Sequence, residues 1–207
     1  MKKGGFMKDA VILFIITLVS GALLGGVYQV TKGPIEEANK ATQLAAYKQV
    51  LPDAAEFDDS ATADAVVKAT ADLAGKTAEF GNVYVDSAAE AKDASGAAMG
   101  YVVNATSKDG FGGEVKITVG ITADGTVNGI AFLSLSETPG LGMNAQKEDF
   151  YGQFAGKNQE ALTVTKDGSG AVDNDKVNAM SGATITSKAV TNAVNAALYF
   201  AKNCVTQ

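Results

Sequence analysis

The sequence contains no histidine, no tryptophan and no arginine, and Cys204 is the single cysteine among its 207 residues. One cysteine without histidine excludes a zinc site of Cys and His ligands, an internal disulfide and a four-cysteine iron–sulfur cluster. Ser-His-Asp and Cys-His catalysis within this chain are excluded for the same reason. We therefore expect no catalytic residue and no metal site, and electron transfer would need an organic cofactor. Cys204 is interpreted as an incidental free thiol.

Charge is scarce and unevenly distributed. All 17 basic residues are lysines, and the formal net charge is −6. Four lysines and Asp9 give +3 up to Lys32, which leaves −9 for the remainder. An acidic body lacks the basic face that nucleic-acid binding requires, so no nucleic-acid partner is expected.

One long apolar run lies near the N-terminus. Ala10 to Tyr28 form 19 consecutive positions without a charge, which is close to the length that spans a hydrocarbon core of about 30 Å. Lys2, Lys3 and Lys8 precede it, and the positive-inside tendency then places the N-terminus in the cytoplasm and the rest outside. A cleaved signal peptide is the alternative. We interpret the run as a retained single-pass anchor, because it continues past its small residues without a polar cleavage region.

The remainder of the chain predicts a mixture of helices and strands. Gly33-Pro34 suggests a break, followed by a stalk helix that ends near Leu51 before Pro52. From Asn82 onward, four β-branched, apolar segments alternate with turn signals, including Asp124-Gly125 and a Gly-rich loop at 107–114. The expected class is α+β: an antiparallel sheet with packed helices, preceded by one N-terminal transmembrane helix. The expected divisions are 1–9 (cytoplasmic), 10–28 (transmembrane), 29–80 (helical stalk and linker) and 81–207 (globular domain).

The C-terminal segment predicts the clearest helix, starting at about Thr184 or Ser187 and ending near Asn203. Its apolar face is expected to contain Ile185, Ala189, Ala193, Val194, Ala197, Leu198 and Ala201. The segment "SGATITS" (181–187) clusters hydroxyl side chains where this helix begins. A helix N-terminus with small residues suits a phosphate group, but Ser and Thr also occur there simply as N-caps. Residue types alone leave both interpretations open.

Two motifs resemble those of the FMN-binding domain family. "SGATITS" resembles the flavinylation motif Ser/Thr-Gly-Ala-Thr-x-Thr, and "SETPGLGMNA" (136–145) resembles the Glu-Thr-Pro-Gly-Leu-Gly loop of the same family, about 40 residues earlier. A Pro-Gly turn of type I or II would explain only part of the second string. The resemblance implies FMN held covalently by a phosphoester to Thr184, installed from FAD by a separate flavin transferase. The implied cofactor-binding residues are Ser181, Gly182, Ala183, Thr184, Thr186, Glu137, Thr138, Gly140, Leu141 and Gly142.

Nearly the full chain resembles the G-subunit family of Rnf complexes, through "ITLVSGALLGGVYQVTKGPIEEAN", "GFGGEVKITVGI" and both motifs. This resemblance implies an electron-transfer subunit that is anchored in the bacterial inner membrane and has no catalytic activity by itself. It would belong to an ion pump that couples ferredoxin and NAD oxidoreduction, and its partners would be the other Rnf membrane subunits. One departure is Asn178, where the family often has an Asp that assists the transferase. Tyr101, Phe111 and Tyr151 are interpreted as core or surface residues rather than ring-stacking ones.

Three alternatives remain. The related C-subunit family of the sodium-pumping NADH:quinone reductase shares the motifs but is typically longer. An exported binding or structural module would use the hydroxyl cluster only to cap a helix, and a standalone flavin reductase would act on a diffusible acceptor.

Overall fold

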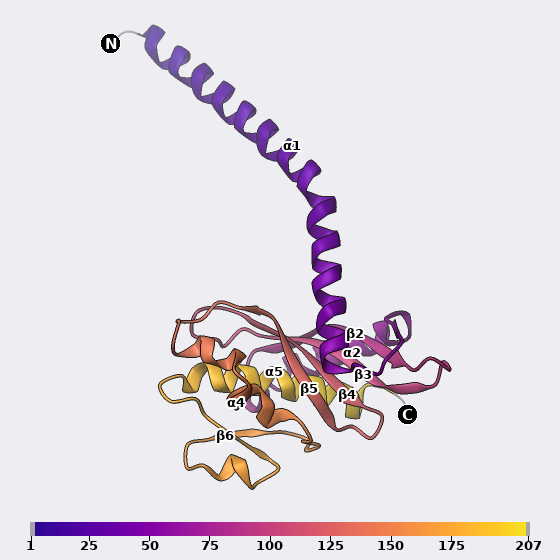
Figure 1. The fold of residues 1–207 in the computed structure, drawn as a ribbon. Coiled ribbons are helices and arrows are strands. Elements are labelled where there is room, and N and C mark those ends of the chain that lie inside the picture. Colours follow the sequence, from indigo (N-terminus) through magenta and orange to yellow (C-terminus); the bar gives the residue numbers. More distant parts are fainter. Residues whose placement is uncertain (1–2, 206–207) are drawn as a thin grey trace. The chain divides into compact units, whose positions relative to one another are not determined.

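The computed structural model describes residues 3–205, and the side chains from Met7 onward. The chain divides into two compact units at the Thr42–Gln43 junction. The first helix, α1, runs from Lys3 to Val50 (Figure 1). It contains a window long and apolar enough to cross a membrane, and no part of that window is buried. The predicted long apolar N-terminal helix is therefore present, and its apolar side chains are exposed, as lipid would require of a membrane-spanning helix.

The predicted break at Gly33-Pro34 is wrong, because α1 continues through both residues. Pro34 removes one backbone donor, so the helix loses the hydrogen bond to the Val30 carbonyl, but it does not end there. An ion pair joins Lys32 to Glu36 across this point, at 3.8 Å in i,i+4 spacing. An interior proline can kink a helix without ending it, so a Gly-Pro pair is not sufficient to place a helix end.

A five-stranded antiparallel sheet forms the centre of the second unit, with the order β1-β2-β3-β4-β5. Its strands are β1 (Glu56–Asp58), β2 (Val83–Lys92), β3 (Ala98–Ser107), β4 (Val115–Thr122) and β5 (Val127–Leu135). The four predicted strand segments correspond to β2–β5, and the α+β class is confirmed. The Asp124-Gly125 hairpin is also confirmed: Gly125 has φ +82°, a conformation that favours glycine, and Ile121 pairs with Val127 across the turn.

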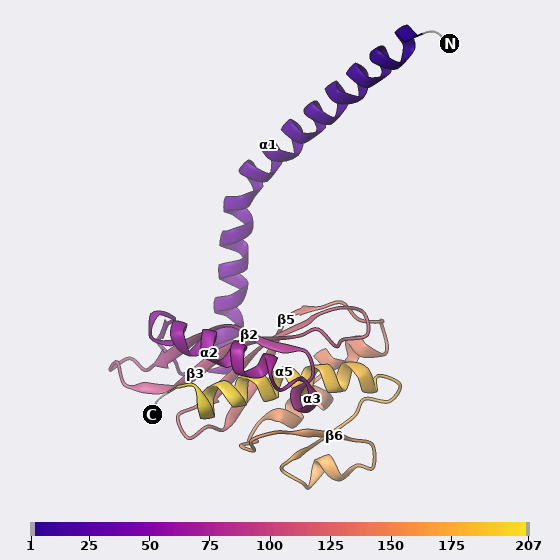
Figure 2. The ribbon, with the colours of Figure 1, turned by 180° about the vertical axis from the view of Figure 1, so that it is seen from behind.

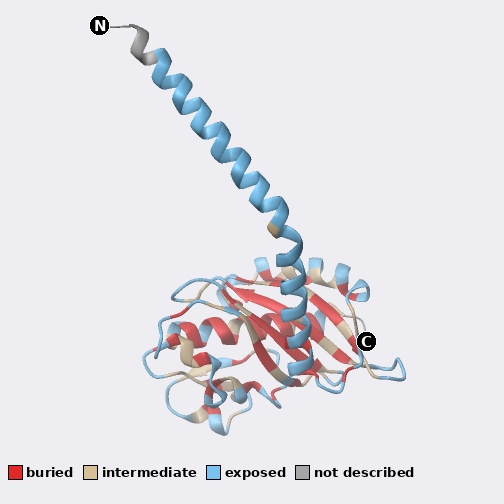
Figure 3. Ribbon diagram, turned by 45° about the horizontal axis from the view of Figure 1, so that its top comes forward, coloured by how far each residue is buried: buried red, intermediate tan, exposed pale blue. Residues whose placement is uncertain are grey.

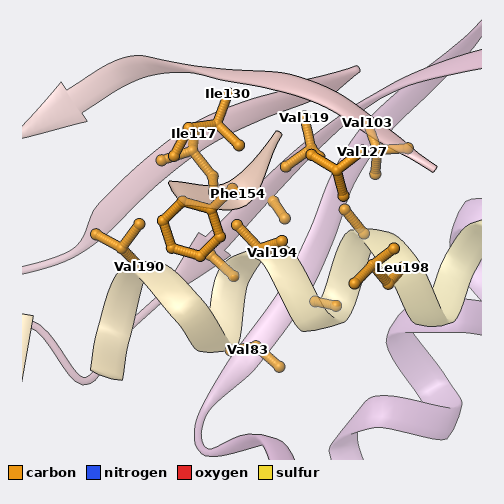
Figure 4. Close-up of a cluster of buried hydrophobic side chains, with 14 of the residues drawn as sticks. Val83, Val103, Ile117, Val119, Val127, Ile130, Phe154, Val190, Val194 and Leu198 are labelled. Atoms are coloured by element: carbon orange, nitrogen blue, oxygen red, sulfur yellow. The ribbon is translucent and has the colours of Figure 1, made fainter. Parts of the chain in front are cut away.

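Helices cover one face of this sheet. The helix α5 (Thr184–Asn203) lies across β3 and β4, with α2 (Ala63–Ala74) and α3 (Thr77–Phe80) beside it (Figure 2). Figure 4 shows Val190, Val194 and Leu198 of α5 directed toward strand side chains such as Ile117 and Val119. These side chains are fully buried, and their removal from water is the main stabilising term of the domain.

The other face packs against the last turns of α1. A second core cluster joins Ala46, Tyr47 and Val50 to Val102 and Ala131 of the sheet. Asn104, which is 2% exposed, donates hydrogen bonds to the Tyr47 hydroxyl (3.0 Å) and the Ser87 hydroxyl (2.9 Å) and accepts one from Thr118 (2.7 Å). Apolar packing and a satisfied polar network therefore hold this segment on the sheet, and Figure 3 shows buried residues along its strands.

The compact unit begins at Gln43, whereas the sequence predicted a separate domain from residue 81. The difference arises because β1 pairs with β2 through Phe57 and Ala91, and α2 packs on the sheet through Leu73. No sequence pattern signalled β1, which has three residues. A strand this short is held by its partner rather than by its own propensity.

One short element, η1 (Ser60–Thr62), lies between β1 and α2, and the others follow β5. They are η2 (Gly142–Gln146), α4 (Glu148–Tyr151), η3 (Gly152–Phe154), β6 (Thr163–Thr165), η4 (Ser169–Ala171) and β7 (Lys176–Asn178). The strands β6 and β7 form a parallel pair, in which Val164 lies opposite Val177. The chain then turns into α5, so this pair delivers the hydroxyl cluster to the start of the helix.

Candidate functional site

The hydroxyl cluster surrounds an uncapped helix end. Ala183 is the N-cap residue of α5, and no side chain caps it. Gly182 has φ +73°, and a Cβ there would lie 3.1 Å from the Leu141 side chain, so glycine is favoured on both grounds. The amides of the first turn therefore lack acceptors and carry the partial positive charge of a helix N-terminus.

The N-capping alternative for these hydroxyls is wrong. Ser187 accepts a hydrogen bond from the Met180 amide and donates one to the Ala183 carbonyl, each at 2.9 Å, so it stabilises the turn from inside the helix. Thr184 is half-buried, and no hydrogen bond joins its hydroxyl to another group in the described part of the chain. This hydroxyl is free to react or to bind.

The second motif forms the opposite wall. The Leu141 amide donates to the Thr138 carbonyl at 3.1 Å, and Gly140 has φ +77°, which identifies a type II turn at Pro139-Gly140. The turn presents Leu141 toward Gly182 and leads into η2 at Gly142. Two motifs that are far apart in sequence thus meet through tertiary packing.

Glu137 is a buried carboxylate in this wall, with 8% of its surface exposed. Its Oε1 accepts a hydrogen bond from the Phe111 amide at 2.8 Å. A Cβ on Gly142 would lie 2.7 Å from Glu137 Oε2 and 2.7 Å from Thr186 Oγ1. The missing side chain of Gly142 therefore makes room for two polar groups.

These elements enclose a cavity of about 360 Å³, which lies within the size range of ligand pockets. Its lining residues are Phe111, Glu137, Thr138, Leu141, Gly142, Lys166, Gly182, Ala183, Thr184, Ile185 and Thr186. Other cavities exist, including one of about 570 Å³ beside Tyr101 and Lys202, but no motif residue lines that one.

Eight of the ten residues implied by the resemblance line this cavity, and two do not. Gly140 is exposed at the turn, and Ser181 lines a neighbouring cavity of about 580 Å³ together with Asn178 and Met180. Asn178 itself is engaged locally: its side-chain oxygen accepts a hydrogen bond from the Gly170 amide at 3.0 Å. Its backbone amide donates to Gln153 at 2.8 Å.

Three lining residues were not expected. Ile185 is 52% exposed, so its predicted place on the buried face of the last helix is wrong; it shares the exposed stripe of Lys188. Phe111 lies in the Gly-rich loop, and only the glycines of that loop had drawn attention to this segment in the sequence. Lys166 follows β6, and nothing in the sequence singled it out. Lys166 takes part in none of the ion pairs among the described residues.

The site fits the phosphate and ring of an FMN group. Uncapped helix amides and the Lys166 ammonium supply positive charge, and the small residues Gly182 and Ala183 allow a phosphate to approach the backbone. Apolar side chains of Phe111, Leu141 and Ile185 remain exposed at the same cavity, as a planar aromatic group would require.

Two family models match parts of this chain. Residues 110–199, a range that includes both motifs, match the FMN-binding domain family, and residues 1–50 match the family described as RnfG N-terminal region. The crystal structure of NqrC from Shewanella oneidensis is similar to part of this chain, with 25% sequence identity and a TM-score of 0.45. The matched region covers 55% of this chain and 54% of the NqrC chain.

Named relatives cover almost the whole chain. The G subunit of the Na(+)-translocating ferredoxin:NAD(+) oxidoreductase complex of Acetobacterium woodii is 35% identical over 196 residues, 95% of this chain and 91% of the relative. The G subunit of the ion-translocating oxidoreductase complex of Methanosarcina acetivorans is 32% identical over 92% of both chains. A proton-translocating relative from Clostridium ljungdahlii is 50% identical over 48% of this chain and 52% of its own length. With its site, its apolar helix and these relatives in agreement, the chain belongs to the G-subunit family of Rnf-type ion-translocating oxidoreductase complexes.

Proposed function

We propose that this protein is the electron-transfer subunit of an Rnf-type ferredoxin:NAD oxidoreductase and carries FMN covalently on Thr184. The observation that carries the proposal is the unpartnered Thr184 hydroxyl, which lies at an uncapped helix end and faces a cavity that both motifs line. The apolar helix would anchor the protein beside the other membrane subunits of the complex.

Attachment would be a phosphoryl transfer catalysed by a separate flavin transferase. The Thr184 oxygen attacks the FMN-side phosphorus of FAD and forms a new O–P bond. The bond to the bridging oxygen breaks, AMP leaves with the electron pair, and the hydroxyl proton passes to a base of the transferase. No oxidant or reductant is consumed. The transferase would need access to Thr184, which the half-exposed position of this residue provides.

The chain's own residues would then hold the attached group. First-turn amides of α5 and the Lys166 ammonium would stabilise the phosphoester anion. Glu137, Thr138 and Gly142 would shape the opposite wall, and Thr186 would contribute a hydroxyl. When bound, FMN supplies one-electron redox chemistry at its isoalloxazine ring, and the protein contributes position and electrostatics.

The location of the domain is part of the proposal. Lys2, Lys3 and Lys8 precede the apolar segment, so the N-terminus would remain in the cytoplasm and the flavin domain would lie on the extracytoplasmic side. A covalent bond prevents loss of a cofactor that the cell could not recover from that compartment. Labelling of single-cysteine variants with a membrane-impermeant thiol reagent would test the side, with Cys204 replaced by serine as background.

Mass spectrometry tests the attachment. Trypsin should release Val177–Lys188 from protein made with an active transferase, and this peptide should be heavier by one FMN less water, with fragmentation assigning the mass to Thr184. Thr184→Val, which preserves the size of the side chain, should abolish the added mass. Ser134→Ala removes an exposed hydroxyl outside the motif and the cavity, and should retain the added mass. An unmodified wild-type peptide, together with the absence of in-gel flavin fluorescence, would leave only a membrane-tethered α+β module.

A further inference from the structure

Exposed apolar side chains gather around the Thr184 cavity. Phe111 is 70% exposed, Ile185 52% and Leu141 43%, and all three line this cavity. The remaining large apolar side chains that are exposed from Gln43 onward are Leu44, Val67 and Val172, which lie elsewhere. These three side chains form an apolar rim around the polar groups of the cavity, and such an arrangement is typical of a ligand site rather than of ordinary protein surface.

Phe111 lies between two glycines, and the loop has no room for a side chain at either of these positions. A Cβ on Gly110 would overlap the Gly113 carbonyl oxygen, and one on Gly112 would overlap the Ser136 carbonyl oxygen. The backbone of this loop therefore lies in close contact with the start of the second motif at Ser136. Among Gly110–Gly113, Phe111 is the one residue with a side chain, and it lies at the cavity.

A buried carboxylate fixes this loop. Glu137 Oε1 accepts the Phe111 amide hydrogen at 2.8 Å, and Glu137 also lines the cavity. Glycine at position 110 allows this approach, because a Cβ there would lie 3.2 Å from the same oxygen. A hydrogen bond to a buried charged acceptor is among the stronger ones in proteins, so it holds the Phe111 backbone in place.

We propose that Phe111 covers the isoalloxazine ring of the flavin tethered at Thr184, and that Glu137 is a positioning residue for Phe111. The inference rests on the proposed function, because it assigns the place of the ring once the phosphate is at Thr184. A tethered ring has a high effective concentration at the rim, so a single aromatic contact suffices to keep it there. In this proposal Phe111 covers the flavin ring, whereas the sequence was interpreted as placing it in the core or on the surface without contact to the ring.

Quenching of flavin fluorescence by acrylamide tests this contact, since the quencher is neutral and unaffected by the acidic surface. In the flavinylated full chain in detergent, Phe111→Ala should raise the quenching constant about two- to tenfold. This factor is the ratio of covered to uncovered ring that the free energy of one aromatic contact would maintain. Phe111→Tyr should preserve the wild-type value. Val172→Ala is the matched control, because Val172 is 81% exposed but lies outside the cavity. A Phe111→Ala value equal to that of wild type would overturn the proposal.

The positioning role of Glu137 has its own readout. Glu137→Ala removes the acceptor and should increase quenching as Phe111→Ala does, and the double variant should add nothing further. Glu137→Gln keeps an acceptor oxygen and should restore most of the protection, even if Glu137→Ala fails to fold. Quenching that rises to the same extent in Glu137→Gln as in Phe111→Ala would refute the hydrogen-bonded anchor. A protein without covalent flavin would instead refute the proposed function itself, so the two failures are distinguishable.

Discussion

Gly142 offers the sharpest test of the site geometry, because its missing side chain separates two polar groups. Gly142 lies outside the left-handed region, so Gly142→Ala introduces no backbone strain. The new Cβ would lie 2.7 Å from Glu137 Oε2, 2.7 Å from Thr186 Oγ1 and 2.8 Å from Glu137 Cβ. One or more of these groups must move, and overpacking of this kind costs about 1–3 kcal/mol.

The expected result is a loss of both stability and cofactor. For a chain of this length, 1 kcal/mol lowers the Tm by about 2–4 °C, so Gly142→Ala should lower it by about 2–12 °C. Near-UV circular dichroism of the full chain in detergent measures this change. Covalent flavin occupancy, from the ratio of flavin to protein absorbance, should fall in the same sample, because Glu137 and Thr186 would shift into the cavity.

Gly140→Ala is the matched control from the same motif. Gly140 has φ +77°, and a Cβ added there would meet no atom within 4 Å, so alanine strains the backbone by about 1–2 kcal/mol without filling the cavity. The Tm should fall in both variants, but flavin occupancy should remain near that of wild type in Gly140→Ala. Full occupancy and an unchanged Tm in Gly142→Ala would refute this geometry.

Three further predictions concern the core, the surface and the charge at the site. Asn104→Ala should destabilise the domain by about 1–3 kcal/mol, measured by denaturant unfolding, because the buried Thr118 hydroxyl loses its acceptor and the Tyr47 and Ser87 hydroxyls each lose one donor; an unchanged midpoint would contradict this. The Ser60 hydroxyl, Lys92 and the Ser60 amide lower the Asp58 pKa to about 2, so its stabilising contribution is present above about pH 4 and is lost as the pH falls toward 2. The stability of Asp58→Asn should therefore fall less steeply over that interval, and parallel curves would refute the linkage. Lys166→Glu should lower the midpoint potential of the flavin by about 10–40 mV, because a negative charge at the cavity opposes reduction, and the change should be smaller at high salt. Spectroelectrochemistry should show no such change in the control Lys147→Glu, because Lys147 lies at another cavity. Equal shifts in the two variants would exclude a local effect of Lys166.

Local sequence patterns were sufficient for the apolar N-terminal helix, the strands β2 to β5, the C-terminal helix and the family. An uncharged run of 19 residues predicts a membrane helix because its length and composition alone satisfy the bilayer. Alternating β-branched residues and the Asp124-Gly125 turn predicted β2 to β5, since these signals act between neighbours in the chain. The two motifs indicated the family through short strings, and the comparisons confirmed it.

Two errors had different causes. Gly33-Pro34 did not end α1, because an interior proline can be accommodated in a helix at the loss of one hydrogen bond, whereas Ile185 lies at the cavity and not on the buried face of α5 because of the elements packed around that helix. A helical pattern identifies which residues share a face, but the neighbouring elements decide which faces are covered. The strand β1 had no signal of its own because its partner strand creates it.

The sequence by itself determined that this chain has a membrane helix, an α+β domain and two strings typical of flavin attachment. Only the tertiary structure decided that Glu137, Gly142 and Thr184 line one cavity, that Ser181 and Gly140 do not, and that Phe111 and Lys166 do. The physical reason is that each string specifies its own backbone turn, whereas a cavity exists between loops whose relative positions are set by the sheet and by the packing of α5 upon it.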